Sequence, residues 1–392
     1  MMSISKKATS ISSFSNWQLQ REANTLIERG LDIINMGTEE PDFATPQPII
    51  RALKRAIEEG FTNYAPPGGI LELKEALIRY YEKYEQVQLS PEEIIITSGA
   101  SQALWLALLS IIDLEDDVLI PVPYWSSYPE MVRLAGAKPI FIPPEDNFYI
   151  NLKSIYKNWT KNTKALLISS PINPSGNVIK EKDLEEMVNL CKEKNAFIIV
   201  DESFQAYVYP PNKFFSSSKF FQNFKENLIL AGSFSKTYSM SGWRIGYSIG
   251  SQKVIDTMVS IQSSTSTGPP TFCQMAAIEA LSFPPRFYQK LKEEFAKRKS
   301  LAIELCCSTL EVECNNPEAT FYILPSIKKF SHKGSIKDCV AMAGYLLREG
   351  LTYVVPSISF GIEDHLRISF ALPQTKIKEG FRRIGQALNL LG

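Results

Sequence analysis

The chain has 392 residues, 44% of them hydrophobic and 21% charged, which is typical of a soluble globular protein large enough for more than one domain. Its 42 basic and 42 acidic residues cancel, which argues against a nucleic-acid-binding protein because such proteins carry a basic surface. The longest apolar run, residues 103–112, is about half as long as a bilayer span requires. We therefore expect a soluble protein with neither a nucleic acid nor a membrane as its partner.

Six cysteines without a CxxC pair predict reduced, mostly buried thiols, and with them a cytoplasmic location. The chain has only two histidines, so we expect neither a bound metal nor a serine–histidine triad. The serine-rich N-terminal segment lacks the apolar core of a secretory signal. Its composition leaves an organelle-targeting segment as an alternative, but it favours a mobile arm.

From about residue 90 to 250, short runs rich in Ile, Leu and Val alternate with segments of helical period. The runs are EIIITS, DVLIPVP, PIFIPP, KALLISS, AFIIVD, LILAGS and RIGYSIG. Most are continuously apolar, as strands covered on both faces are. The segments LWLALLSIID and EKDLEEMVNLCKEKN are typical of the helices between them. The alternation predicts an α/β domain with a mostly parallel seven-stranded sheet.

After about residue 285 the pattern changes to a long charged helix, three shorter strand-like pieces and a final helix. The strand-like pieces are EATFYIL, LTYVVP and HLRISFA. We expect residues 1–47 to form an N-terminal arm and part of the small domain, 48–285 a large cofactor-binding domain, and 286–392 a small α+β domain. A cleft between two such domains is where small-molecule sites usually lie.

The segment SGASQAL, which contains Ala100 and Ser101, places small residues between a strand and a helix. The free N–H groups at such a helix start bind anions, most often phosphate. Neither GxGxxG nor GxxxxGK[ST] occurs, so the motif indicates neither a dinucleotide nor a nucleoside triphosphate. Taken alone, such a segment is more often an ordinary strand-to-helix turn than an anion site.

The segment SFSKTYSMSGWRIGY follows an apolar strand and contains Ser233, Ser235, Lys236 and Arg244. Two hydroxyls and a guanidinium suit a phosphate group. A lysine directly after a buried strand is not typical of a surface charge. Burial lowers the pKa of an amine and makes it able to form an imine with an aldehyde.

Two further polar residues follow buried strands. Asp201 ends the run IIVD, where a carboxylate needs a cationic or hydrogen-bonding partner unless it caps a helix. Asn173 lies in SSPINPSG, a turn that is structural more often than functional. A phosphate site, an amine, an aspartate for a protonated ring nitrogen and an aromatic ring together fit pyridoxal 5′-phosphate (PLP).

With these residues the sequence resembles the class I and II aminotransferases of fold type I, in particular the aspartate aminotransferase-like branch. The motifs that carry the resemblance are EEPDFATP, YAPPGGI, PYWSSYPEM, SSPINPSG, SFSKTYSMSGWRIGY and HLRISFA, in this order over most of the chain. The resemblance implies a PLP enzyme that acts on an L-amino acid and a 2-oxo acid.

The resemblance also implies a role for each matching residue. Lys236 would form the internal aldimine and then move the proton of the substrate, and Asp201 would pair with the pyridinium nitrogen. Trp125 would stack on the ring and Asn173 would hydrogen-bond its O3′, both facing the substrate as well. The phosphate would be bound by the backbone amides of Ala100 and Ser101 and by Ser233, Ser235 and Arg244.

Two more residues resemble known family positions. Tyr64, in NYAPPGG, resembles the tyrosine that reaches the phosphate of the neighbouring subunit, which makes a homodimer the expected unit. Arg367, in HLRISFA, resembles the arginine that binds the substrate α-carboxylate with a bidentate fork, although a surface arginine on an edge strand is the alternative.

Four positions depart from the family pattern. Glu39 replaces a glycine beside the substrate carboxylate, where it would repel acidic side chains and could pair with a cationic one, unless it turns outward. Phe204 replaces a tyrosine that donates to O3′. Ser101 stands where one aspartate-specific branch has a lysine, which weakens aspartate as the substrate. The family's Gly-Ala-Phe turn reads Ala319-Thr320-Phe321 here, and we expect the extra side-chain bulk to narrow the pocket from the small domain.

Two outcomes therefore stay open after the first step at Cα. The first is transamination, which we favour. The second is elimination and cyclisation of a hydroxylated basic amino acid, as in relatives that resemble capreomycidine or enduracididine synthases. Glu39 would then hold a guanidinium or ammonium group.

Overall fold

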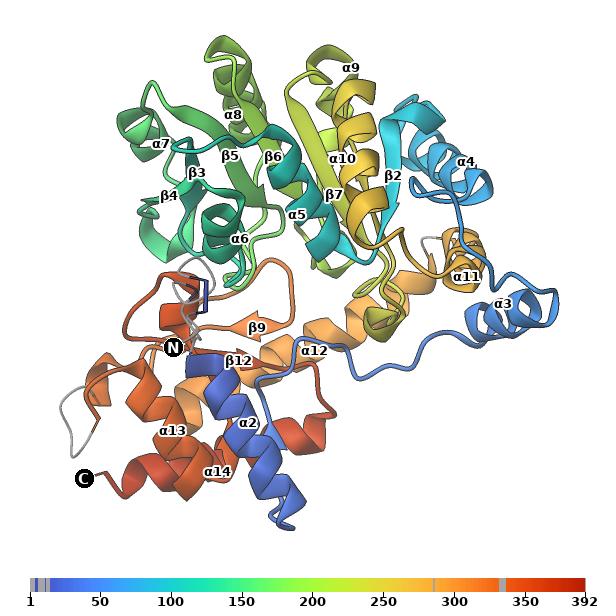
Figure 1. Ribbon diagram of the computed structural model, residues 1–392. Coiled ribbons are helices and arrows are strands. Elements are labelled where there is room, and N and C mark those ends of the chain that lie inside the picture. The colour runs from blue at the N-terminus through green and yellow to red at the C-terminus, as the bar shows by residue number, and fades with distance from the viewer. Residues whose placement is uncertain (1–3, 6–10, 12–14, 285, 331–335, 392) are drawn as a thin grey trace.

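The computed structural model describes the chain except for residues 1–3, 6–10, 12–14, 285, 331–335 and 392. Most of the predicted N-terminal arm, and the predicted domain boundary at residue 285, lie outside the described residues. The described residues form a lobe built on a large sheet and a second lobe of helices with small sheets (Figure 1). In the described ranges, no helix is both long and apolar enough to cross a membrane.

The large sheet has seven strands, and each predicted apolar run overlaps one of them. They are β2 (Ile94–Thr97), β3 (Asp117–Pro121), β4 (Lys138–Ile142), β5 (Thr163–Ser169), β6 (Phe197–Asp201), β7 (Leu228–Ser233) and β8 (Gly246–Ile249). The strand order is β2-β8-β7-β6-β5-β3-β4, and only β8 runs against its neighbours. The predicted α/β fold with a mostly parallel seven-stranded sheet is confirmed.

Helices cover both faces of this sheet, which explains why the strand sequences are continuously apolar. One face packs against α5 (Ala100–Ile111), α6 (Tyr128–Ala135) and α10 (Gln252–Thr265). The other packs against α3 (Gln47–Glu58), α4 (Leu71–Tyr80), α7 (Leu152–Asn158), α8 (Glu181–Glu193), α9 (Phe221–Phe224) and α11 (Thr271–Leu281). Neighbouring residues point to opposite faces: Ile95 belongs to the first core, and Ile94 and Ile96 to the second.

The second lobe combines both ends of the chain. It contains α2 (Ser15–Glu28), β1 (Ile34–Asn35), α12 (Arg286–Thr309), β9 (Tyr322–Ile323), α13 (Cys339–Glu349), β10 (Thr352–Tyr353), β11 (Val355–Pro356), β12 (Leu366–Ser369) and α14 (Gln374–Asn389). Strand β1 pairs with β10, and β11, β12 and β9 form an antiparallel sheet. The α+β composition is as predicted, while the boundaries at 47/48 and 285/286 stay a prediction.

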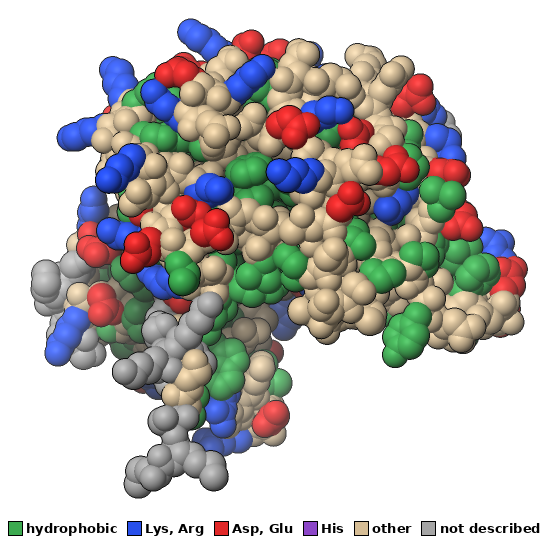
Figure 2. Space-filling model, turned by 45° about the horizontal axis from the view of Figure 1, so that its top comes forward, with side chains coloured by type: hydrophobic (Ala, Val, Ile, Leu, Met, Phe, Trp, Pro, Cys, Tyr) green, Lys and Arg blue, Asp and Glu red, His purple; other side chains and the backbone are tan. Residues whose placement is uncertain are grey.

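The chain between β1 and α3 runs from the second lobe to the first (Figure 1). Residues 36–46 of this connection contain no helix or strand. It carries Glu39 past the carboxyl ends of the parallel strands, where Lys236 follows β7. On the face shown in Figure 2, basic and acidic side chains are interspersed rather than gathered by sign.

Candidate active site

A cavity of about 220 Å³ lies at the carboxyl ends of β5, β6 and β7, beside the N-terminus of α5. This is the usual ligand position in an open α/β sheet. Most residues singled out from the sequence line it: Glu39, Ala100, Ser101, Trp125, Asn173, Asp201, Ser233, Ser235, Lys236 and Arg244. The fold therefore brings together side chains that are far apart in the sequence.

Lys236 lies three residues after the end of β7, and its amine points into this cavity. Its Nζ donates to the backbone carbonyl of Glu39 and lies 5.8 Å from the ring centre of Phe204. Burial lowers the pKa of Lys236, although the carboxylates of Glu39 and Glu40 oppose the shift. The amine is thus more readily deprotonated than an exposed lysine, as a nucleophile or base must be.

Asp201 ends β6 and has hydrogen bonds to both carboxylate oxygens. The Tyr128 hydroxyl donates to Oδ2 over 2.9 Å, and Ser203 donates to Oδ1 from its backbone N–H over 3.0 Å and from its hydroxyl over 2.5 Å. Burial raises the pKa of Asp201, while these bonds and the Lys236 charge lower it. The carboxylate is held in one orientation at the cavity wall.

Tyr128 and Ser203 were not identified from the sequence. Tyr128 is the first residue of α6 and lies in the same PYWSSYPEM segment as Trp125, whose ring centre is 5.6 Å away in an edge-to-face contact. The three-residue spacing from Trp125 was the available signal. It did not show which residue Tyr128 contacts, because Asp201 is 73 residues further along the chain.

One end of the cavity is built to receive an anion. Gly99 precedes α5 with φ of 83°, so the backbone N–H groups of Ala100 and Ser101 open the helix toward the cavity. Arg244 donates to the backbone carbonyls of Ser241 over 2.9 Å and Ser98 over 3.1 Å. A guanidinium fixed beside a helix N-terminus favours a phosphate group.

Asn173 supplies a polar group that lacks a partner. Its side chain is buried in the cavity wall, and its Oδ1 makes no hydrogen bond. A buried amide without a partner is costly, so a ligand that hydrogen-bonds there gains affinity. Trp125 lines the same cavity and offers an aromatic face to a flat ligand.

Arg367, on β12, has only 1% of its side chain exposed. It does not line the cavity itself, but its Nη1 lies 2.7 Å from Oε1 of Glu39, which does. Its Nη2 donates to the backbone carbonyl of Gly37 over 3.1 Å. The sequence left open whether Glu39 turns outward; the structure shows it turned inward onto Arg367.

Phe204, Thr320 and Tyr64 were also singled out from the sequence, and they differ in their position relative to the cavity. Phe204 lines the cavity and packs edge-to-face on Phe321, with ring centres 5.3 Å apart. Thr320 is fully buried but does not line the cavity, so the expected narrowing by this residue is wrong. Tyr64 is 91% exposed and is not brought to the cavity, and its role toward a neighbouring subunit stays a prediction.

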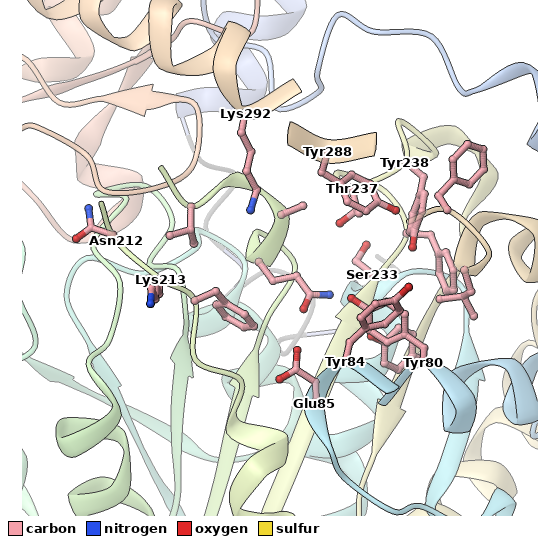
Figure 3. Close-up of a pocket in the computed structure, with 18 residues that line it drawn as sticks. Tyr80, Tyr84, Glu85, Asn212, Lys213, Ser233, Thr237, Tyr238, Tyr288 and Lys292 are labelled. Atoms are coloured by element: carbon pink, nitrogen blue, oxygen red, sulfur yellow. The ribbon is translucent and has the colours of Figure 1, made fainter. Parts of the chain in front are cut away.

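A larger cavity of about 450 Å³ adjoins the first and shares Ser233 with it. Figure 3 shows that Tyr80, Tyr84 and Glu85 lie on one side of this cavity and Tyr288 and Lys292 on another. We place the active site in the smaller cavity, because Lys236, Asp201 and the anion-binding helix end meet there.

Comparisons with known proteins identify the family of the chain. Residues 31–384 match the family of class I and II aminotransferases. The chain belongs to this family. It is 37% identical to a probable aspartate/prephenate aminotransferase of Aquifex aeolicus over 94% of each chain. It is 33% identical to an aspartate aminotransferase of Bacillus subtilis over 98% of each.

The solved structure of Thermus thermophilus aspartate aminotransferase with maleate superposes with a TM-score of 0.92 at 31% identity, over 99% of this chain and 100% of that one. The predicted family, the fold and the aminotransferase function are confirmed. The relatives do not favour elimination and cyclisation.

Proposed function

We propose that this aminotransferase uses PLP to transfer the amino group of an L-amino acid to a 2-oxo acid. The convergence of Lys236 with Asp201 in one cavity, beside the helix start at Ala100, carries the proposal. An amine, an acid held by hydrogen bonds and a phosphate site are the three groups that PLP requires of a protein.

The residues present fit the cofactor. Lys236 would bind its aldehyde carbon covalently, and Asp201 would hold its ring N–H. The helix start at Ala100, with Arg244 beside it, would hold the phosphate. The side-chain N–H of Asn173, which lines the cavity, would donate to the ring oxygen. When bound, PLP supplies an electron sink that stabilises negative charge at the substrate Cα.

The chain's own residues then orient the substrate and move the proton. Arg367 binds the α-carboxylate, which directs the Cα–H bond toward Lys236. Burial lowers the pKa of Lys236, which makes its amine better able than an exposed lysine to accept the proton from Cα and return it later. Asp201 must be ionised to hold the ring nitrogen protonated, and the hydrogen bonds from Tyr128 and Ser203 favour the ionised form against the burial that raises its pKa.

Two further features concern the assembly of the protein and its location. We propose a homodimer, because Tyr64 is fully available to reach a second subunit. We also propose a cytoplasmic location, in keeping with six cysteines that are all free in the structure.

A transamination assay with Lys236→Ala tests the proposal. The wild-type protein with PLP should convert an L-amino acid and a 2-oxo acid into the exchanged pair, and Lys236→Ala should lose at least about a thousandfold in rate, because no other group replaces the nucleophile and base. Lys74→Ala is the matched control, because burial also lowers the pKa of Lys74, which contacts Pro91 away from the site. Near-normal activity of Lys236→Ala would refute the assignment.

A further inference from the structure

The ion pair between Glu39 and Arg367 joins a fixed partner to a movable one. The Arg367 guanidinium carbon lies 4.5 Å from the ring centre of Tyr322 and 4.8 Å from that of Phe360, and its side chain is 1% exposed. The Glu39 side chain is 43% exposed and lies in a connection without helix or strand. The guanidinium therefore stays in place, whereas the carboxylate can turn away from it and still line the cavity.

The pair lies in the path of the substrate. Glu39 lines the same cavity as Lys236, and Lys236 Nζ donates to the Glu39 backbone carbonyl. A substrate that places its α-carboxylate on Arg367 and its Cα–H near Lys236 must lie against Glu39. Its carboxylate would compete with that of Glu39 for the Nη1 group, 2.7 Å away in the pair.

Arg367 has one more donor to offer. Its Nε is buried and has no hydrogen-bond partner, while Nη2 already donates to Gly37. A bidentate carboxylate takes two adjacent N–H groups of a guanidinium. The Nε–H lies beside Nη2 and not beside Nη1, so a carboxylate that takes the Nε edge gains a bond that Glu39 does not make, while its charge replaces that of Glu39 on the guanidinium.

We propose that Glu39 determines the substrate side chain of this aminotransferase: the substrate carboxylate displaces it from Arg367, and the released carboxylate then favours a cationic side chain and disfavours an acidic one. The released carboxylate has left its cation and lies beside the substrate, where a like charge is repelled and an opposite charge is attracted. The proposal rests on the proposed function, because it takes Arg367 as the carboxylate site. It names amino acids with an ammonium or guanidinium side chain as the preferred donors.

Unreactive ligands test this without turnover. Adipate and 4-guanidinobutanoate have similar lengths and one carboxylate for Arg367, and they differ in the charge at the far end. Calorimetric titration of the PLP-bound protein should show at least about tenfold tighter binding of 4-guanidinobutanoate than of adipate, as a close charge contact of roughly 1.4 kcal/mol or more requires.

Two variants separate charge from size. Glu39→Gln keeps the shape of the side chain and Glu39→Gly removes it, and both should bind adipate on the order of tenfold more tightly and lose the preference for 4-guanidinobutanoate. Thermal unfolding checks that both variants fold, which their exposed loop position favours. An unchanged ligand preference in both variants would overturn the proposal, and so would the absence of binding of either ligand to wild type and variants.

Kinetics separate this proposal from the proposed function. The ratio of kcat/KM for L-arginine to that for L-aspartate should fall by about tenfold or more in Glu39→Gln, while Lys236→Ala abolishes turnover with both donors. If no donor is transaminated but the ligand preference shifts with Glu39, the proposed function fails and the charge selection stands. If transamination depends on Lys236 but substitution of Glu39 changes neither the kcat/KM ratio nor the ligand preference, the charge selection fails and the proposed function stands.

Discussion

The hydroxyl of Tyr128 donates to Oδ2 of Asp201 over 2.9 Å, and this bond joins the start of α6 to the end of β6. Ser203 occupies the other carboxylate oxygen, so Tyr128 provides the bond that fixes Oδ2. Burial raises the pKa of Asp201, and the bonds from Tyr128 and Ser203 oppose this shift and so favour the ionised carboxylate. Tyr128 is thus a positioning residue that acts through Asp201.

Tyr128→Phe should raise the pKa of Asp201, since a hydrogen bond that stabilises the charged form is lost. Activity should then decline at a higher pH on the acidic side of its pH profile, and PLP affinity should fall by on the order of tenfold. A pH profile of kcat checks the first effect, and a PLP-binding titration checks the second. Tyr124→Phe is the control, because Tyr124 stacks on Phe141 instead. An unchanged acidic limb in Tyr128→Phe would contradict the role.

Gly246 allows the start of α5 to approach β8. A Cβ atom at this position would lie 2.5 Å from the carbonyl carbon of Gly99 and 2.6 Å from the nitrogen of Ala100. Gly246→Ala should therefore displace the helix start and weaken PLP binding by about tenfold or more. Gly242→Ala should leave binding unchanged, because a Cβ there meets no atom within 4 Å. Equal PLP affinity in the two variants would contradict the assignment of the phosphate site.

Phe204 lacks the hydroxyl that would stabilise the negative form of the cofactor ring oxygen. Phe204→Tyr should restore such a bond, which is worth roughly 1.5–3 kcal/mol. The pH midpoint of the cofactor's visible absorbance change should then move down by about one to two units. Phe204→Leu should leave the midpoint where it is in the wild type. If the tyrosine variant titrates like the leucine variant, the hydroxyl does not reach the ring oxygen.

Glu202 links stability to pH. Burial raises its pKa from 4.5 to about 7, although it accepts bonds from Ser216 and Ser217. Between pH 4.5 and 7 the folded protein keeps a proton that the unfolded chain releases, so the contribution of this group to the unfolding free energy falls by about 3 kcal/mol as pH rises and is constant above pH 7. Glu202→Gln should flatten this slope in denaturant titrations. An equal slope in both proteins would contradict the prediction.

The seven strands of the large sheet could be predicted because each is buried on both faces and is therefore continuously apolar. The small lobe was harder, since β10 and β11 contain only two residues each within the run LTYVVP. So few paired residues leave little periodicity in the sequence. Pairing of β10 with β1, near the other end of the chain, and packing in the core of the second lobe define these strands instead.

Lys236, Asp201 and Arg244 could be found because each belongs to a short motif at the end of a strand. The contacts of Glu39 could not, because its partner Arg367 is 328 residues away and only the fold brings the two together. The same holds for Tyr128 and Asp201. Sequence motifs thus located the residues of the site, and the tertiary structure showed which of them act as pairs.

Borohydride reduction of the PLP-bound protein, followed by peptide mass mapping, tests the central claim most directly. Reduction fixes PLP irreversibly to the amine that binds its aldehyde carbon. We predict a single labelled peptide with the label on Lys236, and loss of this label when an accepted amino acid is added before reduction. Labelling of a different lysine, or the same labelling with and without the amino acid, would contradict the account.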